Sequence, residues 1–255
     1  MAAVVKFDVS LSSDSESWIP IGTAFMVNAG YAKEEENDIP VWIFLTSNHA
    51  ILEEMKGVMQ NGGEVGFRFW GVDTWYGKSN SFEVPGKLIG CRGIIADGEN
   101  VATLLAVKGN PGMLVDHNPN TMPPDYYYPF PLERIGGPCS LGSEGMDMVG
   151  FPMNANGQSE PLLSHIQGPY DGVNFQEVHS GIRMSGIIGR GLGNGGSSGS
   201  SLLDRHTGNI CAVLNFGTLE DNGEAGFNVL PDQQFLQEQI EQFLQQQVKN
   251  LKSEN

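Results

Sequence analysis

Short apolar runs, separated by turn-forming residues, repeat along most of the chain. Each run is five to eight residues long and rich in valine, isoleucine, leucine and phenylalanine. Runs of this length, bounded by glycine, proline, asparagine and aspartate, predict β-strands rather than helices. The clearest runs are residues 23–27, 41–47, 65–70, 101–107, 147–151 and 209–216. Because no regular alternation of strands and helices accompanies them, we expect an all-β fold in which antiparallel strands form a sandwich or barrels.

The end of the chain follows a different period. Apolar residues recur there every three or four positions, the spacing of one helix face; they are Leu236, Ile240, Phe243, Leu244, Val248 and Leu251. Asp232, which follows Pro231, is a suitable N-cap. We therefore expect an amphipathic helix over residues 231–255, packed on the second half of the chain. Its glutamine-rich face is expected to contact solvent, and a partner-binding face is the alternative.

A stretch rich in proline and asparagine interrupts the strand pattern in the middle of the chain. Such a stretch is typical of a connector between two folded units. The sequence therefore predicts an N-terminal unit at residues 1–112, a connector at 113–139, a C-terminal unit at 140–230 and the helix at 231–255.

Composition and charge narrow the classes of partner. Of the 255 residues, 40% are hydrophobic, which is enough for a packed globular protein. The net charge of −16 repels phosphate groups, so we expect neither nucleic acid nor a membrane as a partner. No apolar stretch approaches the length of a membrane span, and Lys6 and Asp8 interrupt the first apolar run too early for a signal peptide.

The number and spacing of the cysteines bear on disulfides, metal binding and cellular compartment. Cys91, Cys139 and Cys211 are odd in number and far apart, so we expect neither a disulfide framework nor a metal site. A reducing cytoplasm fits this pattern best, whereas secretion stays open if a leader was removed from the chain. The sequence does not indicate an oligomeric state.

The segment GGSSGSSLLD, residues 195–204, is open to several interpretations. A flexible linker is the simplest, although the segment runs directly into an apolar strand. The glycines within 191–196 match a phosphate-binding loop, but no helix follows them. Residues 195–199 match the G-x-S-x-G nucleophile elbow, which requires an acid and then a histidine downstream. His206 is the sole histidine after this segment.

A fourth interpretation rests on residues 196–202, Gly-Ser-Ser-Gly-Ser-Ser-Leu. This stretch resembles the loop G-x-S-G-[GS]-x-L of the trypsin-like (chymotrypsin-fold) serine peptidases. A serine hydroxyl needs a neighbouring base to become a nucleophile, and the oxyanion that it generates needs converging N–H donors. The resemblance implies that Ser198 attacks and that the N–H groups of Gly196 and Ser198 form the oxyanion hole.

Four further blocks resemble the same family, in its bacterial-type branch, and stand in the family's order. They are residues 22–27 (GTAFMV), 45–50 (LTSNHA), 148–152 (MVGFP) and 212–217 (AVLNFG). The resemblance implies two antiparallel six-stranded β-barrels with His49 as general base. It also implies hydrolysis of polypeptide substrates without a metal or an organic cofactor.

The third member of the catalytic set departs from the family pattern. The family's acid stands in a block D-[IV]-A-x-L, whereas this chain has Asn100 at the head of its matching block. In a serine triad that replacement lowers turnover by about 10⁴. Three possibilities stay open: Asp97 or Glu99 supplies the acid, a slow Ser-His-Asn set operates, or the protein is a degenerate peptidase that only binds peptides.

The resemblance also implies where a substrate would lie. Leu192 stands at the floor of the primary specificity pocket, which favours a neutral or apolar side chain, and Asn215, Phe216 and Gly217 would pair with the substrate backbone. An esterase of a different fold is a further rival. The remaining histidines are explained by surface positions; they are His117, His165, His179 and His206.

Overall fold

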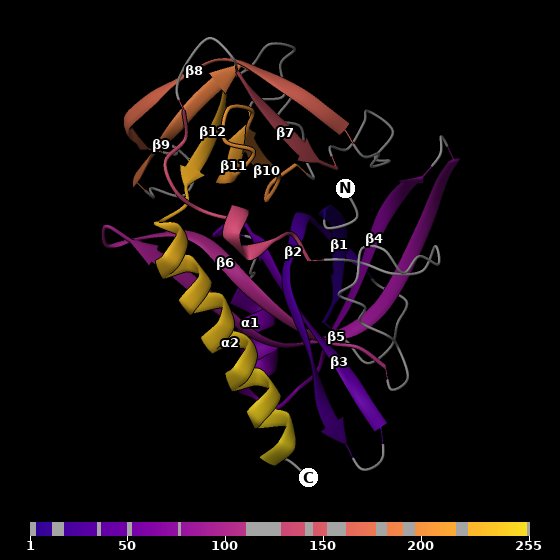
Figure 1. Ribbon diagram of the computed structural model, residues 1–255. Coiled ribbons are helices and arrows are strands. Elements are labelled where there is room, and N and C mark those ends of the chain that lie inside the picture. The colour runs from indigo at the N-terminus through magenta and orange to yellow at the C-terminus, as the bar shows by residue number, and fades with distance from the viewer. Residues whose placement is uncertain are drawn as a thin grey trace.

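The strands of the protein close into two barrels, one above the other in Figure 1. The computed structural model describes residues 4–11, 18–34, 37–49, 53–75, 78–110, 129–140, 145–151, 162–176, 183–190, 197–217 and 224–253. The N-terminal part of the chain forms the first barrel and the C-terminal part forms the second. A C-terminal helix runs down from the second barrel along the first.

Six antiparallel strands make the first barrel in the order β1-β2-β3-β6-β5-β4, and β4 pairs with β1 to close it. The strands are β1 (Val4–Ser10), β2 (Ile19–Glu34), β3 (Asn37–Thr46), β4 (Val65–Trp75), β5 (Lys78–Ala96) and β6 (Glu99–Lys108). One helix, α1 (Glu53–Gln60), connects β3 to β4.

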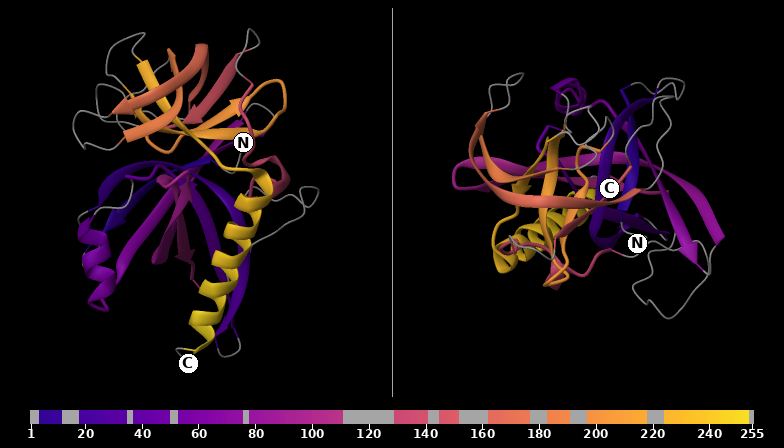
Figure 2. Two further views of the ribbon diagram at one scale, coloured as in Figure 1. Left: turned by 90° about the vertical axis from the view of Figure 1, so that its left-hand side faces the viewer. Right: turned by 90° about the horizontal axis from the view of Figure 1, so that it is seen from above.

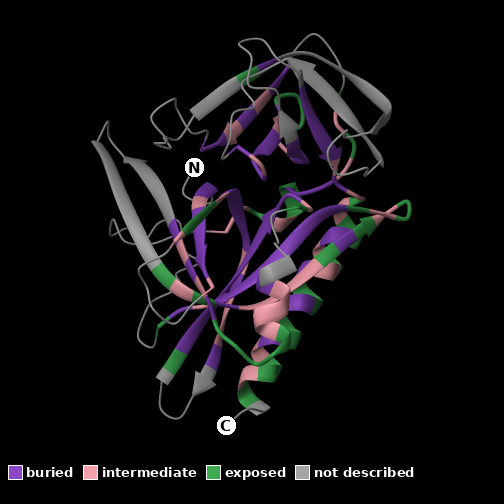
Figure 3. Ribbon diagram, turned by 180° about the vertical axis from the view of Figure 1, so that it is seen from behind, coloured by how far each residue is buried: buried purple, intermediate pink, exposed green. Residues whose placement is uncertain are grey.

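Aromatic side chains fill the interior of the first barrel, where Figure 3 shows the strands buried. The rings of Phe7 and Phe67 stack with their centroids 5.2 Å apart, and Phe44 and Phe69 lie 5.0 Å apart. Trp42 meets Phe69 edge-on. Ring pairs of this kind add stabilisation beyond the area that they bury, so the first barrel has a rigid aromatic core.

The second barrel has the same antiparallel construction, in the order β10-β11-β12-β9-β8-β7, closed by pairing of β7 with β10. Its strands are β7 (Met146–Gly150), β8 (Leu162–Gln176), β9 (Arg183–Arg190), β10 (Ser201–Asp204), β11 (Ile210–Gly217) and β12 (Glu224–Val229). The prediction of two antiparallel six-stranded barrels and a C-terminal helix is therefore confirmed.

A disulfide joins Cys139 to Cys211, across 72 positions of sequence. The odd number and wide spacing of the cysteines, which argued against a disulfide framework, did not predict this bond. Cys139 precedes the second barrel and Cys211 lies on β11, so the spacing along the chain does not show that folding brings them together. The assignment to a reducing cytoplasm loses this support and stays a prediction.

Helix α2 (Gln233–Ser253) begins as the sequence predicts. Asp232 accepts hydrogen bonds from the N–H groups of Gln234 at 2.9 Å and Phe235 at 3.3 Å, so it is the N-cap. Among the predicted apolar residues of the helix, Leu236, Ile240 and Phe243 are buried.

The helix packs on the first barrel, not on the second half of the chain as expected, and this correction is visible in Figure 2. Its apolar face meets the outer surface of β2 and β3, where Val27, Ala32 and Ile43 belong to the same buried cluster. Gly30 on β2 lets Leu244 approach closely, since a Cβ at position 30 would lie 3.3 Å from a Leu244 methyl group. No helix in the described part of the chain is both long enough and apolar enough to cross a bilayer.

Candidate active site

His49 lies in the turn that follows β3 and is exposed. Its Nδ1 atom is 2.8 Å from Oδ1 of Asn215, on β11 of the second barrel. An amide oxygen only accepts hydrogen bonds, so the ring nitrogen that faces it carries the proton. In the neutral ring this bond leaves Nε2 as the nitrogen that can accept a proton.

The serine loop forms a tight turn in front of β10. The N–H of Ser200 donates to the carbonyl of Ser197 at 2.8 Å, and Gly199 has φ +89°. A positive φ at the third residue is characteristic of a type II turn. Ser198 therefore stands at the corner of this turn, half-buried.

Thr23 of β2 connects this turn to the strand that precedes His49. Its N–H donates to the carbonyl of Ser198 at 2.8 Å, and its own carbonyl accepts the hydroxyl of Thr46 at 2.8 Å. Its hydroxyl accepts the N–H of Phe151, from the second barrel, at 2.9 Å. Thr23 thus holds the two barrels together between the candidate nucleophile and the candidate base.

Two further hydrogen bonds place Ser198 and His49 at the same junction. The carbonyl of Leu214 accepts a hydrogen bond from the N–H of Gly199, and the N–H of Leu214 donates to the carbonyl of Ser200, both at 2.8 Å. Leu214 precedes Asn215, the residue bonded to His49. No hydrogen bond joins Ser198 to His49 among the described residues, which is common before a substrate tightens such a pair.

No hydrogen bond joins the first barrel's candidates, Asn100 and Asp97, to His49 among the described residues. The carbonyl of Asn100 accepts a hydrogen bond from Asn48 Nδ2 at 2.8 Å, but its exposed side chain lies over Gly93, on the neighbouring strand. Asp97 and Gly98 form the two-residue turn between β5 and β6, with φ of +52° and +82°. These are type I′ angles, so Asp97 is explained as a turn residue. The hydrogen bond that the structure gives to His49 Nδ1 belongs to Asn215, and the catalytic role of Asn100 or Asp97 stays a prediction.

The structure describes some of the other candidate residues and not the rest. Phe216 and Gly217 lie on β11 and pair with Gly226 and Ala225 of β12. His206 is exposed in the turn after β10. Several candidates lie outside the described residues; they are Leu192, Gly196, His117, His179 and the glycine motif at 191–196.

Unpaired polar atoms flank both candidate residues. Ser47 Oγ and Asn48 Oδ1, next to His49, and Ser197 Oγ, next to Ser198, are buried without a hydrogen-bond partner among the described residues. Leaving such groups unpaired costs free energy, and in native proteins they call for an explanation. Their position indicates that stability is not the only constraint on these two turns.

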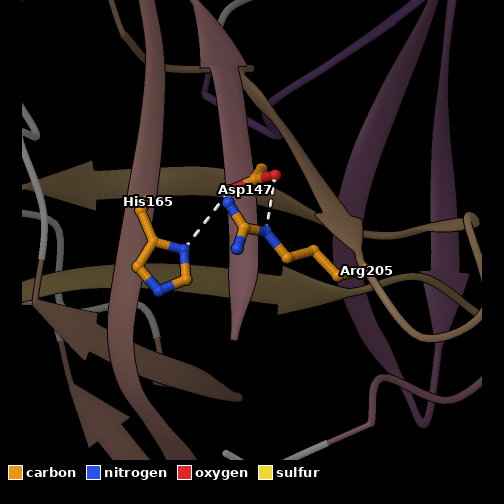
Figure 4. Close-up of polar contacts among 3 residues, drawn as sticks. All are labelled: Asp147, His165 and Arg205. Carbon is orange, nitrogen blue, oxygen red and sulfur yellow. Dashed lines mark hydrogen bonds and ion pairs between the residues drawn. The ribbon is translucent and has the colours of Figure 1, made fainter. Parts of the chain in front are cut away.

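A second cluster of charged groups lies on the surface of the second barrel (Figure 4). Asp147 of β7 accepts two contacts of 2.8 Å from Arg205 and one of 3.3 Å from Nδ1 of His165 on β8. Burial alone would raise the pKa of Asp147, but the hydrogen bonds from Arg205 and His165 hold it below its usual value. This cluster ties strands of one barrel together, which explains His165.

No protein-family model and no curated protein matches the sequence. Several solved structures have a similar backbone. The active form of the Rv3671c protease from M. tuberculosis is 15% identical with a TM-score of 0.44, and the match covers 90% of this chain and 76% of that chain. The thermostable serine protease AL20 from an extremophilic microorganism is 13% identical with a TM-score of 0.47, and the match covers 100% and 98%.

A catalytically inactive tobacco etch virus protease complexed with substrate is 12% identical, with a TM-score of 0.43 and coverage of 95% of this chain and 84% of that chain. These likenesses are too remote to assign any residue. The site described above rests on the contacts of this chain alone.

Proposed function

We propose that this protein is a serine endopeptidase that hydrolyses peptide bonds, with Ser198 as nucleophile and His49 as general base. The observation that carries the proposal is the hydrogen bond between His49 Nδ1 and Asn215 Oδ1, at the junction where the Ser198 turn docks. It leaves the basic Nε2 free to receive a proton. A base oriented by a third group beside a serine in a tight turn is the arrangement that covalent acyl transfer requires.

The reaction follows from these two groups. The Ser198 hydroxyl passes its proton to His49 Nε2 as Oγ bonds to the peptide carbonyl carbon, and the carbonyl oxygen takes the π electrons. When the C=O bond re-forms, the C–N bond breaks and Nε2 gives the proton to the leaving amine. A water molecule then repeats the sequence on the acyl-enzyme: its proton passes to Nε2, its oxygen bonds to the acyl carbon, and Ser198 leaves with the proton.

Strand β11 offers a place for the peptide backbone. β12 pairs with β11 as far as Gly217, whereas the pairing of β10 with β11 ends at Val213. Phe216 and Gly217 therefore pair with β12 on one side, and no described strand pairs with them on the other. An extended peptide that adds to the other side would pass directly beside Asn215 and His49.

A non-catalytic peptide-binding module on the same fold is the second candidate. The observation that favours it is that the amide of Asn215, and not a carboxylate, contacts His49. A neutral partner orients the ring but supplies no charge to stabilise the imidazolium, so the proposal expects a slow enzyme.

A fluorophosphonate probe separates the two candidates, because it bonds only to a serine that a neighbouring base activates. Mass spectrometry is expected to find the adduct on Ser198, and to find none in Ser198→Ala. His49→Ala is expected to slow labelling by about 10³-fold or more, whereas His165→Ala, a histidine on the second barrel's surface, labels like the wild type. A folded wild-type protein that binds peptides but does not label would support the module.

A further inference from the structure

We propose that Asn215 is the positioning residue of His49, so that the second barrel orients the base carried by the first. The inference rests on the proposed function and assigns to a β11 side chain the role that the resemblance gives to an acid of the first barrel. Asn215 was expected only to pair with the substrate backbone.

The local backbone explains how Asn215 reaches across the junction. Along β11, Leu214 pairs with Phe227 and Phe216 pairs with Gly226, so the register shifts at Asn215, which is the extra residue of β11. This is a β-bulge, which bends a strand and re-aims the side chain of the extra residue. The side chain of Asn215 is consequently directed at His49 of the other barrel.

Burial makes this contact persistent. Asn215 is 3% exposed, and a buried amide that loses its partner pays the full cost of desolvation. The bond to His49 Nδ1 is therefore favoured over solvent, although His49 itself is exposed. The same bond selects the tautomer with the proton on Nδ1, which is the one that proton transfer from Ser198 requires.

Because the positioning residue lies on β11, substrate binding and the orientation of His49 are connected. Because Asn215 adjoins residues 216 and 217, a peptide that adds to β11 contacts the strand that holds the histidine in place. Orientation of the base then depends on the docking of the two barrels and on the occupancy of β11. A positioning residue of the first barrel would be independent of both.

The test compares Asn215→Ala and Asn215→Asp with Asn228→Ala as a matched control. Asn228 is equally buried, at 3%, lies on the adjacent strand β12, and also bridges the barrels through a 2.9 Å bond to the carbonyl of Val101. It does not contact His49 among the described hydrogen bonds. Loss of a generic inter-barrel bond should therefore affect both alanine variants alike, whereas loss of positioning should affect Asn215→Ala alone.

The first readout is the ¹⁵N resonance pattern of the His49 ring. The wild type and Asn228→Ala are expected to show the Nδ1–H tautomer, and Asn215→Ala the Nε2–H tautomer that predominates in free imidazole side chains. An unchanged tautomer in a folded Asn215→Ala protein would overturn the inference. This readout needs no turnover, so it stands even if the wild type fails to label and the proposed function falls.

The second readout is the rate of Ser198 labelling as a function of pH. Asn215→Ala is expected to slow labelling by about 10²-fold or more, while Asn228→Ala stays within about threefold of the wild type. Asn215→Asp is expected to label faster and to shift the acid limb of the profile to higher pH, because a carboxylate favours the protonated ring. Equal rates and pH profiles in the wild type and Asn215→Ala would contradict the inference.

Discussion

The two barrels share one strand order but are stabilised by different means. In the first, aromatic rings stack at its centre, and every ring pair among the described side chains belongs to it. In the second, the described buried cluster holds Met146, Met148, Leu214 and a single phenylalanine, Phe227, and the Cys139–Cys211 disulfide links the segment before β7 to β11. The described side chains of the two barrels therefore pack differently on the same topology.

The difference matches what each barrel contributes to the proposed site. The first barrel supplies His49 from a turn that follows the well-packed strand β3. The second supplies Ser198 and Asn215 from a turn and a bulge, two departures from regular strand geometry. The disulfide links β11, the strand that carries the bulge, to the segment before the second barrel.

The largest expected effect comes from the aromatic core. Phe67→Ala removes a fully buried ring that packs against Phe7, Phe44 and Phe69, and we expect it to lower the free energy of unfolding by about 4 kcal/mol. Phe67→Leu, which leaves a smaller cavity, should cost less than half as much. Denaturant titration measures both, and similar losses in the two variants would refute the assignment of an aromatic core.

The second prediction concerns the disulfide. For a sequence separation of 72 residues, the loss of the link in Cys139→Ser is expected to cost about 4 kcal/mol or somewhat less. Hydrogen exchange should then accelerate in β7 and β10, while β3 and β4 of the first barrel keep their protection. Uniform acceleration in both barrels would show that they are not stabilised separately.

The third prediction addresses the junction. In Gly199→Ala the new Cβ would lie 1.9 Å from the carbonyl oxygen of Thr23, so the serine turn must move away from the first barrel. We expect a loss of about 3 kcal/mol and of Ser198 labelling. Gly98→Ala is the control, because its φ is also positive but its Cβ meets nothing within 4 Å; it should cost only about 1 kcal/mol and leave labelling intact. Equal effects would mean that strain, not docking, governs the turn.

The smallest expected effect is on how the stability of the second barrel depends on pH. Burial would raise the pKa of Asp204, but the N–H groups of Ser140, His206 and Thr207 bond to its carboxylate and hold the pKa below its usual value. A lowered pKa stabilises the fold above the unfolded value, near 4, and this contribution disappears as the pH falls further. Thermal melts of Asp204→Asn between about pH 5 and 2 should therefore show a weaker acid dependence than those of the wild type. If the melting temperature falls equally steeply with pH in the variant and the wild type, Asp204 is excluded as a source of acid sensitivity.

Local patterns in the sequence predicted the strands and the helix because each depends on neighbouring residues. The Asp232 cap is a local signal of this kind, and so is the Asp-Gly pair at 97–98, which is typical of a two-residue hairpin turn. The disulfide and the packing of α2 on the first barrel depend on which distant surfaces meet. The role of Asn215 depends on the register between β11 and β12, since only a bulge distinguishes it from an ordinary strand residue.

The most direct test of the account is a crystal structure of the protein with a phosphonate bonded to Ser198. We expect the phosphorus on Ser198 Oγ, Nε2 of His49 within hydrogen-bond distance of an oxygen of the adduct, and Nδ1 still bonded to Asn215 Oδ1. A phosphonate on another serine, or a His49 ring turned away from the adduct, would contradict the claim that the two barrels meet to form one catalytic site.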